Sequence, residues 1–163
     1  MPASLTENLP EALKGVRTRP LFVLREQIPP LIIVGETPGV FRRVGVVAGG
    51  AFEGDRLSGE VVTGNDWQEL RKDNCLRLDV RLVLKTTDEA MIVMSYQAFR
   101  TGPRGVLEEL DKGEPVDPES YYFRMIPLFE TGAPQYDWLN RIVSIGIGHR
   151  RADGPLYSIF EVL

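Results

Sequence analysis

The sequence predicts an all-β fold, a single antiparallel β-barrel preceded by a short N-terminal helix. Three observations favour this class. Apolar and polar residues alternate with a period of two in most segments after Pro20, turns rich in Gly, Pro, Asp and Asn separate these segments, and no segment has a helical pattern long enough to cover a sheet. A barrel is favoured over a sandwich because closure leaves no exposed strand edge.

The chain divides into an N-terminal extension at residues 1–20 and a barrel domain at residues 21–163. Ser4 or Thr6 is suited to cap a short helix over Leu5–Lys14, in which every fourth residue from Leu5 is a leucine. Such a helix would present one apolar face, so we expect it to act as a plug or flap over an open end of the barrel.

The barrel domain contains roughly eight to ten short strands joined largely by hairpins. The clearest predicted strands lie at residues 21–28, 40–47, 75–85, 90–99, 121–129, 141–149 and 156–162, with shorter ones between residues 52 and 72. Turns are predicted at residues 86–89 and at Asp153-Gly154. The longest connection, residues 101–119, carries one expected helical turn at residues 106–110, and a loop of that length is typical of a lid or a mobile segment.

Composition limits the classes of function. The chain has 163 residues, one cysteine, one histidine and a net charge of −4. An internal disulfide is excluded, a Cys/His zinc site is disfavoured, and a general attraction to nucleic acid is not expected. No run approaches the ~20 apolar residues of a membrane span. We therefore expect a cytoplasmic protein that uses no metal or cofactor and binds no nucleic acid or membrane.

Several short motifs occur together along the barrel domain. They are Gly50-Ala-Phe-Glu-Gly, Leu57-Ser-Gly-Glu-Val, Asn65-Asp-Trp, Leu78-Asp-Val-Arg, Tyr122-Phe-Arg, and Phe129-Glu-Thr-Gly through Tyr136-Asp-Trp-Leu-Asn. In this order the chain resembles the domain of unknown function 3237 family, also called uncharacterised protein family 0311. The resemblance implies a lipocalin-like β-barrel and no established activity. This chain departs from the family's usual pattern at two turns. At Asp55 the family commonly has proline, and at Asp88-Glu89 it usually has an acidic residue followed by glycine.

The strand at residues 75–85 offers two alternative inner faces. One face is aliphatic, and the other carries Asp79 and Arg81. If the aliphatic face packs in the core, the charged face is merely solvated. If the charged face lines a ligand cavity, Asp79 becomes a candidate catalytic base and Arg81 a candidate ligand-binding residue, because a barrel of about eight strands has room for one small ligand.

Further candidate ligand-binding residues lie on the neighbouring strands and connections. Tyr96 and Tyr122 would supply phenolic donors, and Arg124 would bind a carboxylate through two parallel hydrogen bonds. Trp67 and Trp138 would close the cavity, although both also suit a core position.

Three functions follow from these residues. The first is binding of a small, anionic or carbonyl-bearing organic molecule in the barrel cavity. The second is a cofactor-independent isomerase, cyclase or lyase with Asp79 as base. The third is a structural subunit that forms a homo-oligomer through a strand face. The sequence does not decide among them, because it does not show which strand face points inward.

Overall fold

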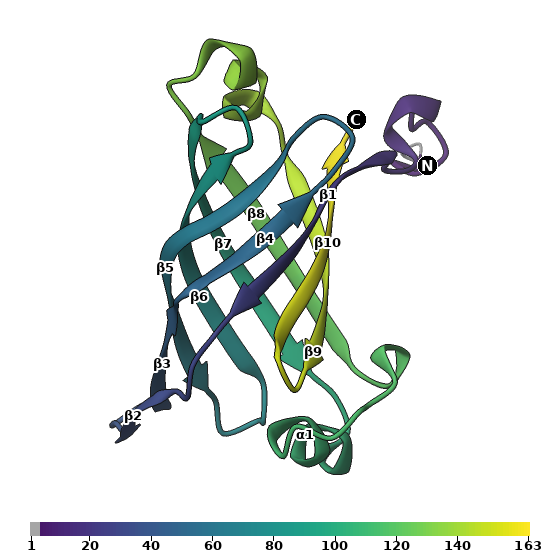
Figure 1. Cartoon of the computed structure of the whole chain (residues 1–163). Coiled ribbons are helices and arrows are strands. Elements are labelled where there is room, and N and C mark those ends of the chain that lie inside the picture. The colour runs from purple at the N-terminus through teal and green to yellow at the C-terminus, as the bar shows by residue number, and fades with distance from the viewer. Residues whose placement is uncertain (1–3) are drawn as a thin grey trace.

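The computed structural model describes residues 4–163. Within these residues the chain forms a ten-stranded sheet joined mostly by hairpins (Figure 1). The strands are β1 (Thr18–Gln27), β2 (Ile32–Glu36), β3 (Phe41–Val47), β4 (Gly49–Glu53), β5 (Ser58–Leu70), β6 (Leu76–Thr86), β7 (Met91–Thr101), β8 (Tyr122–Glu130), β9 (Ser144–Arg151) and β10 (Gly154–Val162). The all-β prediction is therefore confirmed, and the predicted strands overlap observed ones, although no strand was predicted at β2.

Eight of the strands close into an antiparallel barrel, and two extend from it. The closed order is β5-β4-β1-β10-β9-β8-β7-β6, and β6 pairs again with β5. The remaining strands, β2 and β3, continue from the far half of β5, where Val44 lies opposite Trp67. Closure rests on the pairing of β1 with β10, which begins with Thr18 opposite Val162.

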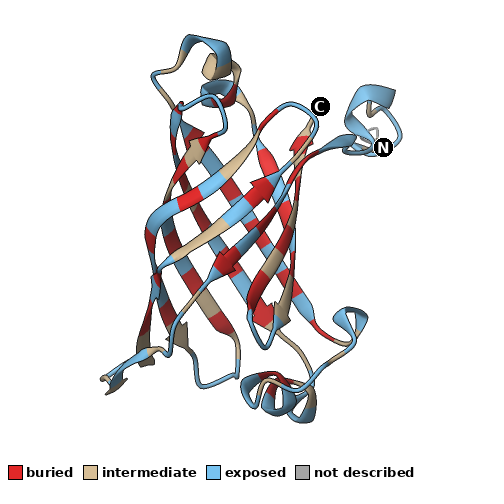
Figure 2. Cartoon of the chain, viewed as in Figure 1, coloured by how far each residue is buried: buried red, intermediate tan, exposed pale blue. Residues whose placement is uncertain are grey.

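Side chains alternate between the barrel interior and the solvent, as the bands of burial in Figure 2 show. On β6 the aliphatic face points inward, with Leu78, Val80 and Leu82 at most 3% exposed. Each fully buried aliphatic side chain stabilises the fold by roughly 1.5–3 kcal/mol. The opposite orientation would expose this row and bury Asp79 and Arg81, so the aliphatic face determines which side turns inward.

One irregularity changes the alternation on β5. The register with β6 shifts between Val61 and Thr63. An extra residue on one strand reverses which side chains beyond it point into the barrel and which point outward. Val61 is buried before the shift, and Gly64, Asp66 and Gln68 are buried after it. The shift thus turns two polar side chains into the barrel.

Short helical segments cover the two ends of the barrel. The α-helix α1 (Arg104–Asp111) lies at one end and buries Leu107 and Leu110. The 3₁₀ segment η3 (Pro134–Arg141) lies at the other end and buries Leu139. A third short turn, η2 (Pro118–Ser120), precedes β8. No helix within residues 4–163 is long and apolar enough to cross a bilayer.

The predicted N-terminal helix over Leu5–Lys14 is not confirmed. Only the turn η1 (Glu11–Leu13) forms, and Leu5 and Leu13 remain 91% and 66% exposed. Pro10 interrupts the predicted span, because proline lacks the amide hydrogen and clashes with the preceding helical turn. The segment lies beside the barrel rather than across its end (Figure 1).

Candidate functional site

A polar cavity lies inside the barrel at the end covered by α1. Its volume is about 120 Å³, comparable with the ~150 Å³ cavities that take up benzene. Its polar lining comes from six residues on four strands and α1, and its apolar lining includes Leu76, Leu78, Leu110 and Phe123. The six polar residues are Arg43, Asp66, Gln68, Arg100, Asp111 and Arg150, and Tyr157 adds a phenol.

Asp66 is the buried carboxylate of this cavity. It is 3% exposed, and Gln68 Nε2 donates to its Oδ2 at 2.6 Å. Gln68 Oε1 in turn accepts from Arg43 Nε at 2.7 Å. Burial raises the pKa of Asp66 to about 6, against the opposing effects of the Gln68 hydrogen bond and of the Arg43 charge. Its other oxygen, Oδ1, is buried and has no hydrogen-bond partner within residues 4–163.

A second buried carboxyl, Glu26, lies deeper in the barrel. It is completely buried, and the Tyr96 hydroxyl donates to its Oε1 at 2.8 Å. The Tyr96 hydroxyl also lies 3.3 Å from that of Tyr157, which lines the cavity. Burial raises the pKa of Glu26 to about 8, so the neutral acid predominates at pH 7. Its Oε2 has no partner in the described part of the chain.

Two glycines hold the backbone on either side of Glu26. Gly50 of β4 pairs with Glu26, and Gly154 begins β10. Both have positive φ, +148° and +124°. A Cβ at Gly154 would lie 2.2 Å from the Glu26 carbonyl oxygen, and one at Gly50 would lie 2.1 Å from that of Arg25. Only glycine allows strands this close, so these positions fix where the Glu26 side chain enters the core.

Three guanidinium groups give the cavity its positive charge. Arg100, 6% exposed, donates to Asp111 of α1 at 2.9 Å. Its Nε is buried without a hydrogen-bond partner among residues 4–163. Burial lowers the pKa of Arg43 and of Arg150, although arginine stays protonated at neutral pH. Three cations thus face two carboxylates, Asp66 and Asp111, and a bound anion would balance the charge.

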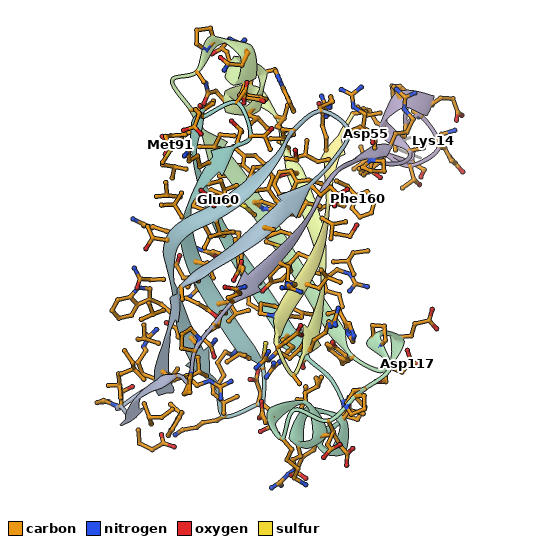
Figure 3. The ribbon with its side chains drawn as sticks, viewed as in Figure 1. Lys14, Asp55, Glu60, Met91, Asp117 and Phe160 are labelled. Atoms are coloured by element: carbon orange, nitrogen blue, oxygen red, sulfur yellow. The ribbon has the colours of Figure 1, made fainter. Side chains whose placement is uncertain are left out.

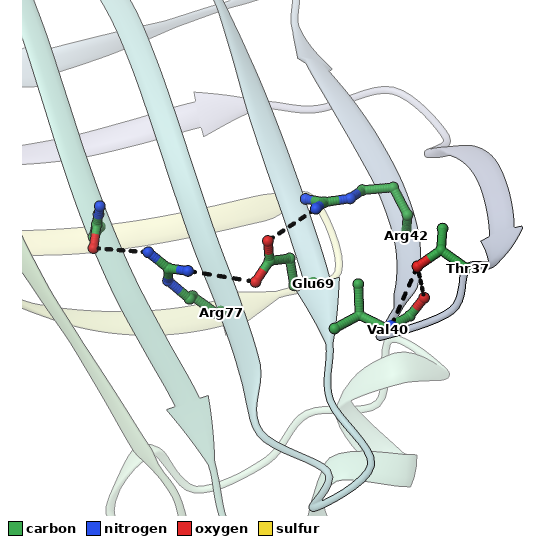
Figure 4. A network of polar contacts seen from close by, with 6 residues as sticks. Thr37, Val40, Arg42, Glu69 and Arg77 are labelled. Atoms are coloured by element: carbon green, nitrogen blue, oxygen red, sulfur yellow. Dashed lines mark hydrogen bonds and ion pairs between the residues drawn. The ribbon is translucent and has the colours of Figure 1, made fainter.

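Of the candidates proposed from the sequence, Tyr96 alone lies in the interior near this cavity. Of the two alternatives for β6, the structure has the aliphatic face inward, so Asp79 and Arg81 lie on the exposed face and not in the cavity. That face is a polar surface, where Arg77 bridges Glu69 and Gln97 (Figure 4).

The remaining predicted residues are also outside this cavity. Tyr122 and Arg124 share a strand face, as expected, but it is the outer face of β8, where Arg124 stacks 4.9 Å from the Tyr122 ring. Trp67 is 51% exposed on the outside of β5. Trp138 lies at the opposite end of the barrel in η3, with the Arg56 guanidinium 4.0 Å above its ring. The reason for Tyr122 and Arg124 is that the apolar half of β8 turned inward. Trp67 faces outward because the register shift on β5 turns Asp66 and Gln68 inward instead.

Sequence reasoning missed most of the interior cluster. A usable signal was a polar residue that lies two positions after a buried apolar residue of the same strand, and therefore on the same face. Glu26 follows Leu24 by two positions, and Arg100 follows Ala98 by two. Asp66 gave no such signal because the shift on β5 reverses its facing. Figure 3 draws the side chains of the described residues on both faces of the barrel.

Comparisons with known proteins agree with this architecture. The UPF0311 protein RPA1785 of Rhodopseudomonas palustris is 34% identical over 149 residues, 91% of this chain and 97% of that protein. A crystal structure of RPA1785, described as a conserved protein of unknown function, matches with a TM-score of 0.88 at 33% identity over 91% of this chain and 99% of that one.

Two further solved structures are similar. A β-barrel-like protein from Acinetobacter baumannii has a TM-score of 0.80 at 31% identity, over 96% of this chain and 99% of that one. An enzyme from Penicillium herquei has a TM-score of 0.72 at 17% identity, over 95% and 100%, and supports the fold alone. The model of the family described as "Protein of unknown function (DUF3237)" matches residues 16–162. With nearly its whole length matched, this chain belongs to the DUF3237 family.

Proposed function

We propose that this protein binds a small organic anion, or a carbonyl-bearing molecule, in the cavity beneath α1. The observation that carries the proposal is the set of buried polar atoms with no hydrogen-bond partner in residues 4–163, among them Asp66 Oδ1 and Arg100 Nε of the cavity lining. Leaving such a group unsatisfied costs about 1–3 kcal/mol, and more when it is charged. A ligand with both a donor and an acceptor would recover that free energy. The cytoplasmic location expected from the sequence remains a prediction.

Charge and size define the ligand further. Arg43, Arg100 and Arg150 outnumber the two carboxylates of the lining, so a carboxylate or an enolate-like oxygen is favoured over an amine. Leu76, Leu78 and Phe123 supply an apolar wall for a hydrocarbon or ring. The cavity volume of about 120 Å³ limits the buried part to about one ring.

Phenylacetate and its neutral analogue phenylacetamide test the proposal by isothermal titration. We expect phenylacetate to bind more tightly, and Arg100→Met to weaken it by ~10-fold or more, which is the effect of losing a charge-assisted hydrogen bond. Arg81→Met, which removes an exposed arginine from the outer face of β6, is the matched control and should leave binding unchanged. Equal binding of the two compounds, no binding of either, or equal losses in both variants would refute the proposal.

A second candidate function is proton transfer on such a ligand. The observation that favours it is the contrast between the two buried carboxyls: the pKa of Asp66 is about 6 and that of Glu26 about 8. At pH 7 the first is chiefly a base and the second chiefly an acid, a combination typical of acid–base sites. Asp66 takes the place of Asp79, which is exposed on the outer surface.

In this mechanism Asp66 Oδ1 removes a proton from a carbon next to a carbonyl, and Arg100 or Arg150 stabilises the enolate oxygen. The proton on Asp66 exchanges with solvent, and Asp66 then returns a proton to the original carbon, to another carbon or to a leaving group, as an isomerase, cyclase or lyase requires. Exchange of solvent deuterium into phenylpyruvate, followed by NMR, tests the step. Wild type should accelerate exchange and Asp66→Asn should not. Equal rates with and without the protein would rule out this activity for 2-oxo acids.

A further inference from the structure

The outer face of β8 and β9 is apolar although it lies outside the barrel. Ile126 and Leu128 on β8 are 56% and 53% exposed, and Ile145 and Ile147 on β9 are 41% and 45% exposed. Val143, just before β9, is 58% exposed. An antiparallel sheet with one wet face normally carries polar residues there. An exposed apolar patch rimmed by polar residues is typical of an interaction surface.

The register of the two strands makes the patch continuous. Arg124 lies opposite Ile147, and Met125 lies opposite Gly146. The Ser144 hydroxyl donates to the Pro127 carbonyl at 2.6 Å, which keeps the same alignment further along. In this register Ile126 is beside Ile145 and Leu128 is beside Val143. We call these four residues together with Ile147 the β8–β9 patch.

Two opposite charges lie at the ends of the patch. Arg124 and Glu130 are both on the outer face of β8, six residues apart. Within residues 4–163 neither has an oppositely charged side chain within ion-pair distance; Arg124 only stacks on Tyr122 and donates to the Phe123 carbonyl at 3.0 Å. The midpoint between the two charges falls at Pro127, in the middle of the apolar side chains.

We propose that the β8–β9 patch binds a second copy of this chain about a two-fold axis. The axis lies between the two sheets, runs across the strands and passes level with Pro127 and Ser144. This operation stacks Arg124 on the partner subunit's Glu130, and Glu130 on the partner subunit's Arg124. It also stacks Ile126 on the partner subunit's Leu128. Self-complementarity of this kind is what a two-fold interface requires.

Charge also selects the direction of the axis. A two-fold axis parallel to β8 would place Arg124 against the partner subunit's Arg124, and Glu130 against the partner subunit's Glu130. Like charges in contact disfavour that dimer. The transverse axis replaces both repulsions by ion pairs at the rim of an apolar centre, which is the usual anatomy of an interface.

The area sets the expected strength. Six residues at ~3.3 Å each, across two strands of ~4.8 Å each, give about 190 Å² per subunit. The total of about 400 Å² lies well below the ~1,200–2,000 Å² of stable, specific interfaces. The dimer should therefore dissociate on dilution rather than be permanent.

Sedimentation velocity of the full-length chain over a wide range of concentration tests the proposal. Wild type should show a monomer–dimer equilibrium. Leu128→Asp should weaken association by about a hundredfold, because it places a charge at the centre of the interface. Val62→Asp, at an apolar position 43% exposed on β5, is the matched control and should associate like wild type. Circular dichroism of each variant confirms that it is folded.

Charge reversal tests the axis. Arg124→Glu and Glu130→Arg should each weaken the dimer by ~10-fold, and the double variant should restore it, because the two pairs reform with exchanged signs. A wild type that stays monomeric at all concentrations overturns the proposal. So does an equal effect of Val62→Asp and Leu128→Asp, or a double variant weaker than either single one. Binding of monomeric wild type to phosphatidylcholine vesicles, lost in Leu128→Asp, would assign the patch to lipid instead.

Discussion

Replacing Glu26 by glutamine should make the stability of this protein much less dependent on pH. Glu26 is completely buried and accepts a hydrogen bond from Tyr96. Burial raises its pKa from the ordinary 4.5 to about 8. The glutamine amide has nearly the same shape as the protonated acid and keeps the oxygen that Tyr96 needs. It therefore imitates the neutral form at every pH.

The sign and size of the pH effect of Glu26 on the unfolding free energy follow from proton linkage. Between pH 4.5 and about 8 the unfolded chain releases the Glu26 proton, while the folded protein retains it. The unfolding free energy is thus highest below pH 4.5 and decreases as pH rises toward 8. At about 1.4 kcal/mol per pH unit the ceiling of this loss is about 5 kcal/mol. Local relaxation and water entry reduce it, so a loss of a few kcal/mol is expected.

Urea unfolding at a series of pH values between 5 and 9 measures this effect. Wild type should lose stability across the range, and Glu26→Gln should lose much less, with the two nearly equal at pH 5. Glu60→Gln is the control, because Glu60 lies exposed on β5 (Figure 3). Parallel pH profiles for wild type and Glu26→Gln would show that the reasoning about burial is wrong.

Three further predictions concern stability. Gly154→Ala should destabilise the protein by more than about 1 kcal/mol, since a Cβ there meets the Glu26 carbonyl at a φ of +124°. Gly39→Ala should not, because apart from its two chain neighbours no atom of residues 4–163 lies within 4 Å of a Cβ there, and chemical unfolding compares the two variants. Leu110→Ala on α1 should cost ~2–5 kcal/mol by leaving a cavity under the helix, as the same measurement would show, and an effect below 1 kcal/mol would mean that α1 is loosely attached. Chelation by EDTA should leave the melting temperature unchanged, because no three His, Cys, Asp or Glu side chains within residues 4–163 are grouped to hold a metal ion; a large decrease would contradict this.

Alternation along single strands made most of the fold predictable. The observed β6, Leu76–Thr86, and β7, Met91–Thr101, lie within two residues of their predictions. Local pattern is sufficient there because burial of one face dominates the free energy of a strand. The N-terminal prediction followed leucine spacing and overlooked Pro10, whose effect on a helix is also local. That error could have been avoided from the sequence.

The candidate site was far less predictable, because its residues come from separate strands and a bulge. Asp66 and Arg43 lie on paired strands, but Arg100 and Arg150 come from other parts of the barrel. Their proximity depends on closure and on the register of every intervening pair. The alternative that turned Asp79 inward failed for a simpler reason. A charged face beside an aliphatic face belongs in solvent unless the barrel interior offers partners for it.

The composition of the interior itself argues for a function at the α1 end. Elsewhere the inner faces of β6 and β7 are filled by residues such as Leu82, Leu84 and Met94, and stability alone would favour more of them. Buried charged groups commonly stabilise less than apolar residues of the same volume, by about 1–4 kcal/mol. Here Asp66 and Arg100 are buried beside the cavity, and each has one polar atom without a hydrogen-bond partner in residues 4–163. A fold selected only for stability would fill that space, so the cluster supports the proposal that a small molecule binds there.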